Sequence, residues 1–120
     1  MAETLLKLRS DKFDSLSFTA PTGGLTAGQL YKVGDTVGVV VSTVAAGATA
    51  VLIYRCPKIV VAKRVGTGIV FAAGAKVYYR SAGPDLTNAT TGNVLCGRAT
   101  VAAGATDDEV EIDLDGTKVA

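Results

Sequence analysis

The chain has 120 residues, of which 48% are hydrophobic and 6% aromatic, with 14 glycines and no tryptophan. Its formal net charge of +1 argues against a uniformly basic nucleic-acid-binding protein, and the lack of histidine removes the commonest general base and metal ligand. This length and composition indicate one domain of strands and tight turns, long enough to fold without metals or disulfides.

The first segment, residues 1–16, precedes the first turn and is expected to be an arm. Its leucines fit neither the helical nor the strand period, and they are interleaved with basic residues. The candidate contact residues of this arm are Leu5, Leu6, Lys7, Leu8 and Arg9. The apolar stretch is too short, and the first acid too early, for a signal peptide, and no run approaches the ~20 residues of a membrane span. The sequence therefore predicts a protein made and kept in a cytoplasm.

A short phrase recurs along the chain. TVAAGAT stands at residues 43–49 and again at 100–106, and VFAAGAK at 70–76 is a third version. A glycine after a small residue precedes strand-like runs at Gly28, Gly47, Gly74 and Gly104. Because glycine reaches positive φ without steric cost, each is expected to be a structural turn glycine, in a tight turn or bulge at the start of a strand. The spacings are too uneven for a solenoid.

The apolar runs between these turn signals predict short strands. In chain order they are expected at residues 16–20, 36–42, 50–56, 58–63, 68–72, 76–81, 94–101 and 108–116. Short strands about ten residues apart favour an all-β fold, a small single-domain β-barrel or β-sandwich of antiparallel strands over residues 17–120. Pro57 falls between two of these strands, as expected for a strand end or an edge. The small, polar stretch 81–93 is expected to be an exposed loop.

Few residues offer chemistry. Cys56 and Cys96 show no metal-binding spacing, so each is expected to be a small buried hydrophobe, with a disulfide between them possible but unsupported. The acidic residues near the end could form a calcium site or an acid pair, but on an alternating strand they are more simply its solvent face. They are Asp107, Asp108, Glu109, Glu111, Asp113 and Asp115. No catalytic residue, metal or cofactor is predicted, and the chain is expected to be a binding or structural module and not an enzyme.

One alternative remains open from the residues themselves. A single-stranded nucleic-acid-binding barrel would use basic residues for the backbone and tyrosine for base stacking. Its candidate residues are Lys58, Lys63, Arg64, Tyr78 and Arg80. Adjacent tyrosines on a strand point to opposite faces, which weighs against a continuous stacking platform.

Four blocks of this sequence, in this order, resemble the DUF2190-type capsid cement or decoration proteins of tailed bacteriophages. They are the APTGG opening, the VGDTVGVVVSTVAAGA block, the AAGAKVYY run, and GNVLCGRA followed by VEIDLDG. The resemblance covers roughly residues 17–116, and it is weakest before residue 17 and over 80–93.

The resemblance implies a structural virion protein on the outer surface of the capsid, made in the host cytoplasm. Such a protein would bind the assembled head where major capsid subunits meet and clamp them against the pressure of packaged DNA. It implies the major capsid protein as partner and favours a homo-oligomer, most simply a trimer. The leucine-rich arm could then add as a strand to an exposed capsid edge, although an arm docked on its own barrel is an equal alternative.

Overall fold

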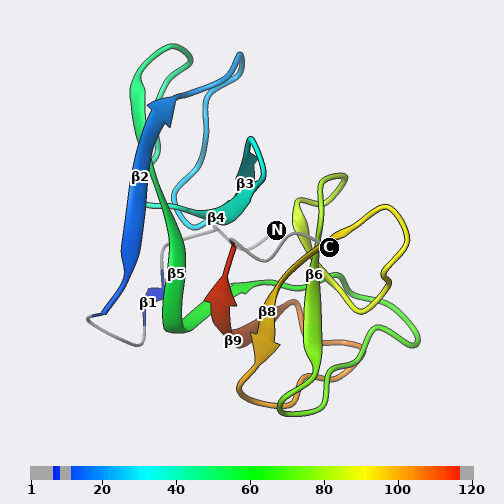
Figure 1. Ribbon diagram of the computed structural model, residues 1–120. Helices are drawn as coiled ribbons and strands as arrows, with labels where there is room; N and C mark the ends of the chain where they lie inside the picture. Colours follow the sequence, from blue (N-terminus) through cyan, green and yellow to red (C-terminus); the bar gives the residue numbers. More distant parts are fainter. Residues whose placement is uncertain (1–6, 9–11, 117–120) are drawn as a thin grey trace.

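The chain folds into one curled antiparallel sheet (Figure 1). The computed structural model describes residues 7–8 and 12–116. Its strands are β1 (Lys7–Leu8), β2 (Asp14–Thr19), β3 (Leu30–Val33), β4 (Thr36–Val40), β5 (Thr49–Ala62), β6 (Lys76–Arg80), β7 (Asp85–Thr87), β8 (Val94–Ala99) and β9 (Glu109–Asp115). This part of the chain contains no helix, and so none that could cross a membrane. The all-β fold expected from the sequence is confirmed, and of the two alternatives, barrel and sandwich, the sheet is barrel-like.

The longest strand, β5, organises the sheet. The first half of β5 pairs with β2 on one side and β4 on the other, and its second half pairs with β1 and β9. The prediction of two separate strands, at 50–56 and 58–63, is therefore wrong. The pairing of β5 with β9 shifts register between Cys56 and Ile59, which places Pro57 at an irregularity inside one strand. A β-bulge tolerates the missing proline N–H without ending the strand.

The second half of the sheet closes into a barrel through β7. The order of neighbouring strands in this part of the sheet is β5, β9, β8, β6, β7. A parallel bridge between Lys63 and Leu86 then joins β7 to the end of β5. The N–H of Arg64 also donates to the carbonyl of Leu86 at 2.8 Å. The prediction of an exposed loop over 81–93 is thus wrong at its centre, because Leu86 and Thr87 are both 0% exposed.

The prediction of a strand over 68–72 is also wrong. This segment lies between two turns, closed by hydrogen bonds from Ile69 to Gly66 and from Ala75 to Ala72. Only Phe71 is left between them for sheet pairing, and it forms an isolated bridge with Ala103. Apolar, β-branched composition favoured a strand here, but the turns leave no length for one.

The recurring glycines occupy tight turns. Gly28, Gly47 and Gly74 have φ values of 82°, 81° and 85°, each at the third position of a four-residue turn, where a type II turn requires positive φ. Gly104 differs, because it begins its turn and does not have a positive φ. Its N–H donates to the Asp107 carboxylate at 2.7 Å.

The structure contains an internal duplication. In the first half, β3 pairs with β4, β4 pairs with the first half of β5, and this part of β5 pairs with β2. In the second half, β6 pairs with β8, β8 pairs with β9, and β9 pairs with the second half of β5. The two halves therefore have the same order of four paired strands. The bridge of Leu25 with Val44 recurs as that of Phe71 with Ala103. Individual hydrogen bonds repeat as well. Gly28 N donates to Val40 O at 2.8 Å, and Gly74 N donates to Ala99 O at 2.7 Å.

The buried apolar residues form two clusters, and the larger one also takes in Leu30, Val37, Val39 and Ile53 of the first half. The larger core, in the closed barrel, includes Ile59, Val61, Phe71, Val77 and Tyr79, all buried. Equivalent positions of the first half, on β2 and β3, belong to a smaller cluster whose outer members are only half-buried. In Figure 1 the connections from β2 to β3 and from β4 to β5 lie at the top, whereas the connection from β8 to β9 lies at the bottom. The molecule thus has two similar halves joined by β5.

Candidate docking surfaces

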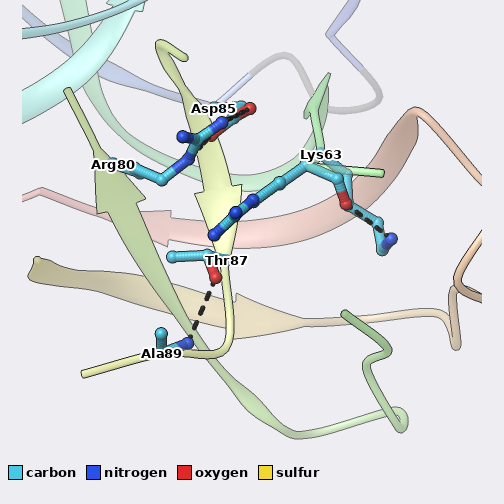
Figure 2. A network of polar contacts seen from close by, with 6 residues as sticks. Lys63, Arg80, Asp85, Thr87 and Ala89 are labelled. Carbon is cyan, nitrogen blue, oxygen red and sulfur yellow. Dashed lines mark hydrogen bonds and ion pairs between the residues drawn. The ribbon is translucent and has the colours of Figure 1, made fainter. Parts of the chain in front are cut away.

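A polar network supports β7 from two sides (Figure 2). Arg80 on β6 donates from Nε and Nη2 to the two carboxylate oxygens of Asp85, both at 2.8 Å. These bonds raise the pKa of the Arg80 guanidinium above its ordinary value. At the other end of the strand, Thr87 Oγ1 accepts from Ala89 N at 3.2 Å. The pair and the turn fix β7 in place, which is a structural role.

Lys63 is a buried part of the same region. It is 3% exposed, and its ammonium donates to the carbonyl of Arg64 at 2.9 Å and to that of Asp107 at 3.3 Å. Burial lowers the pKa of this ammonium, and the nearby charges of Asp107 and Asp85 act in the opposite direction. Lys63 therefore joins the end of β5 to the turn before β9 and is not presented to a ligand.

The structure does not bring the candidate nucleic-acid residues together. Lys63 and Arg80 are engaged within the protein, as described above. Lys58 and Arg64 are exposed, and Tyr78 on β6 is half-buried while its neighbour Tyr79 faces the barrel core. No continuous row of bases and stacking rings results from this placement.

The acidic residues are spread along β9 and the turn before it. Asp107 caps the turn at Gly104, Glu111 accepts from Thr100 Oγ1 at 2.8 Å, and Asp115 lies 3.9 Å from Arg55. In the part of the chain that the structure describes, no group of three possible ligands could hold a metal ion. The strand β9 alternates between buried and more exposed positions, which matches the interpretation of a solvent face.

Both cysteines are buried free thiols. Burial raises the pKa of the Cys96 thiol to about 12, and its Sγ lies 3.7 Å from the carbonyl oxygen of Val77. Cys56 also has a raised pKa, again mainly from burial, and its Sγ donates to the Lys58 carbonyl at 3.4 Å. The thiols therefore behave as the small buried hydrophobes expected from the sequence.

The arm is only partly within the described residues. Lys7 and Leu8 form β1 and pair through the backbone with Val60 and Ile59 of β5. Leu5, Leu6 and Arg9 lie outside the described residues. The end of the segment 1–16 already belongs to β2, which starts at Asp14. A hollow of about 390 Å³ lies beside this start, lined by Lys12, Phe13, Asp14, Arg55 and Pro57.

A half-buried apolar surface lies on the first half, where side chains of β2 and β3 meet. Phe18 on β2 and Tyr31 on β3 stack at 5.6 Å between ring centroids and 14° between ring planes. Leu16 and Val33, on the same two strands, are also half-buried against the smaller core. Sequence reasoning missed this surface, although the alternation of apolar residues in LSFTA and of Tyr31 with Val33 was a signal for one buried face.

These observations define a class of protein. It is a small all-β module whose ionisable groups, in the described ranges, hold the fold together or lie dispersed, and whose apolar surface suits binding to another protein. The chain matches the model of a family described as phage cement protein over residues 10–114, and it belongs to that family. No curated protein matches the chain. The family is structural and associates with the phage capsid, which supports a structural capsid role for this chain.

Proposed function

We propose that the chain is a cement protein of the outer capsid surface, which binds the assembled head and clamps neighbouring major capsid subunits against the pressure of packaged DNA. The observation that carries this proposal is the family match over residues 10–114, nearly the whole described domain. A rigid β module with separate surfaces supports it, because individually weak contacts to several neighbours add through effective concentration. Host cytoplasm is the compartment in which it would be made.

The proposed assembly is a homo-oligomer, most simply a trimer seated on a local threefold axis of the capsid. Exposed apolar side chains support it, since such surfaces are usually covered by a partner. Phe13, Val65, Val70 and Val101 are each about half exposed, between 48% and 54%. Light scattering of the isolated protein should then give three times the chain mass. A monomer at all concentrations in solution, together with single copies on the capsid, would contradict a trimer.

The arm is proposed as a second capsid contact, made by Leu5, Leu6, Lys7, Leu8 and Arg9 through strand addition to a capsid edge. Lys7 and Leu8 pair through the backbone with β5. While this pairing is kept, the capsid contact would be made by the residues before Lys7. Lys7 and Leu8 would add to a capsid strand through this same edge only if β1 separated from β5. Deleting residues 2–6 spares β1 and should weaken binding to heads. Unchanged capsid affinity in this folded variant would remove Leu5 and Leu6 from the proposal.

The proposal is tested by counting copies in the particle. Quantitative mass spectrometry of purified virions should find this chain at a copy number comparable with the major capsid protein. Its absence from virions would overturn the cement function. Steeply salt-dependent binding to single-stranded DNA would then point to the nucleic-acid-binding alternative.

A further inference from the structure

The internal duplication shows which part of the first half is missing a partner. In the second half, the connection between β6 and β8 contains β7, which fills the gap between β6 and the end of β5. In the first half, β3 and β4 are joined by a tight hairpin at Gly34, with Val33 paired to Thr36. No described strand therefore occupies the position equivalent to β7. Among residues 7–8 and 12–116, strands β2 and β3 each pair on one side only.

Burial at equivalent positions shows the effect of this difference. In the second half, Leu86 of β7 covers the core, and Val77 and Tyr79 of β6 are 0% and 7% exposed. Their equivalents on β3, Tyr31 and Val33, are only half-buried. The first half is thus a barrel of the same design, left open along the edge of β3.

The equivalence also defines the chemistry of a strand that would fit. In the second half, Leu86 lies opposite Tyr79, and Thr87 lies opposite Tyr78. The corresponding residues of β3 are Val33 and Lys32. An incoming antiparallel strand would place an aliphatic side chain opposite Val33, over the half-buried core. The residue opposite Lys32, which is exposed, would share its face of the sheet, so an acidic side chain fits there.

We infer that the edge of β3, with the Phe18–Tyr31 stack beside it, is a strand-addition site for an extended segment of the capsid subunit that carries an aliphatic residue next to an acidic one. This inference rests on the proposed function and names how the capsid is gripped. Backbone hydrogen bonds to β3 provide affinity, and the aliphatic and acidic side chains provide specificity. The segment completes in the first half what β7 completes in the second.

The test measures binding of the purified full chain to heads that lack it, by co-sedimentation. Lys32→Glu reverses the charge at the edge, and Val33→Asp places a carboxylate on the apolar site. Each should weaken the apparent Kd at least about tenfold. Their matched controls, Lys58→Glu and Ala73→Asp, introduce a carboxylate at exposed positions elsewhere and should change the apparent Kd less than about twofold. If Val33→Asp does not fold by circular dichroism, Lys32→Glu alone decides.

Each outcome has one meaning. If the wild type binds heads and Lys32→Glu and Val33→Asp bind equally well, the inference is overturned and the cement function stands. If either variant changes the mass of the isolated protein in light scattering, the occupant of the β3 edge is a second copy of the chain, which also overturns the inference. If the wild type does not bind heads, the proposed function fails, and the site is tested with a peptide that copies residues 83–89 with the change Thr87→Asp, at the position that would lie opposite Lys32. At millimolar concentration the peptide should shift the amide NMR signals of Lys32 and Val33, and no shift would overturn the site.

Discussion

Replacing Leu86 with alanine tests whether β7 is part of the cooperative core. Leu86 is fully buried, pairs with Tyr79 of β6, and forms the bridge to Lys63 that closes the barrel. A buried Leu→Ala change costs about 3–5 kcal/mol, from lost transfer free energy and the cavity left behind. Since a domain of this size has on the order of 5–15 kcal/mol of stability in total, the loss is a large fraction of it.

The assay is urea and thermal unfolding followed by circular dichroism. For a domain of this length, a loss of about 3 kcal/mol lowers Tm by on the order of 12 °C. The control is Val65→Ala, which also truncates an aliphatic side chain but at a position 54% exposed, and it should change stability by less than about 0.5 kcal/mol. If Leu86→Ala is as stable as this control, β7 is not packed in the core and residues 81–93 behave as the exposed loop that the sequence suggested.

Three further predictions concern two glycines of the sheet, Cys96 and Arg80. Gly38→Ala and Gly97→Ala should each destabilise by more than about 2 kcal/mol in urea unfolding, because a Cβ at either would collide with a carbonyl oxygen of the adjacent strand, whereas Gly104→Ala, with its nearest neighbour at 3.7 Å, should be neutral. Cys96 should resist Ellman's reagent at pH 8 until urea unfolds the chain. Its pKa, raised to about 12, also means that its contribution to stability is present below its unfolded value of 9.0 and is lost as the pH rises from there towards 12. Arg80→Gln should lower stability by about 1 kcal/mol, since the pair it breaks is only partly buried, and an unchanged urea midpoint would contradict this.

The strands that were predicted correctly have strong local patterns. In β9, Val110, Ile112 and Leu114 alternate with acidic residues, and this period of two is enough to locate a strand with one buried face. The boundaries in the structure, Glu109–Asp115, fall within the predicted range. Local pattern is sufficient here because the flanking turn and the solvent face agree with it.

The elements that were missed depend on distant residues. The strand β7 is three residues long within a stretch rich in glycine, proline and asparagine, so nothing local distinguishes it from a loop. Its burial comes from pairing with β6 and from the bridge to Lys63. Residues 50–56 and 58–63 were predicted as two strands for the opposite reason. Pro57 is a local signal for the end of a strand, but the pairing with β9 on both sides of it holds the two segments in one strand, β5.

The repeated phrase illustrates why the candidate site could not be predicted. The letters of 43–49 and 100–106 match, but in the structure the turn at Ala45–Ala48 is equivalent to the turn at Gly104–Asp107. Gly104 therefore takes the place of Ala45 and not of Gly47. The true duplication is defined by hydrogen-bond register and not by identical letters. The open edge of β3 becomes visible only when the two halves are compared in that register.

The two halves differ in ways that suit one to stabilise the fold and the other to bind a partner. The larger core fills the closed half and also takes in buried residues of β3, β4 and the first half of β5, while the open half leaves half-buried apolar surface beside the edge of β3 for a partner. Because β5 runs through both halves, a pull on β2, or on β3 through β4, passes along one continuous strand into the barrel. There it is shared by the hydrogen bonds of β5 with β9. Under the proposed function, a load from the capsid would thus act in shear on a paired strand inside the sheet, where many backbone hydrogen bonds resist it together.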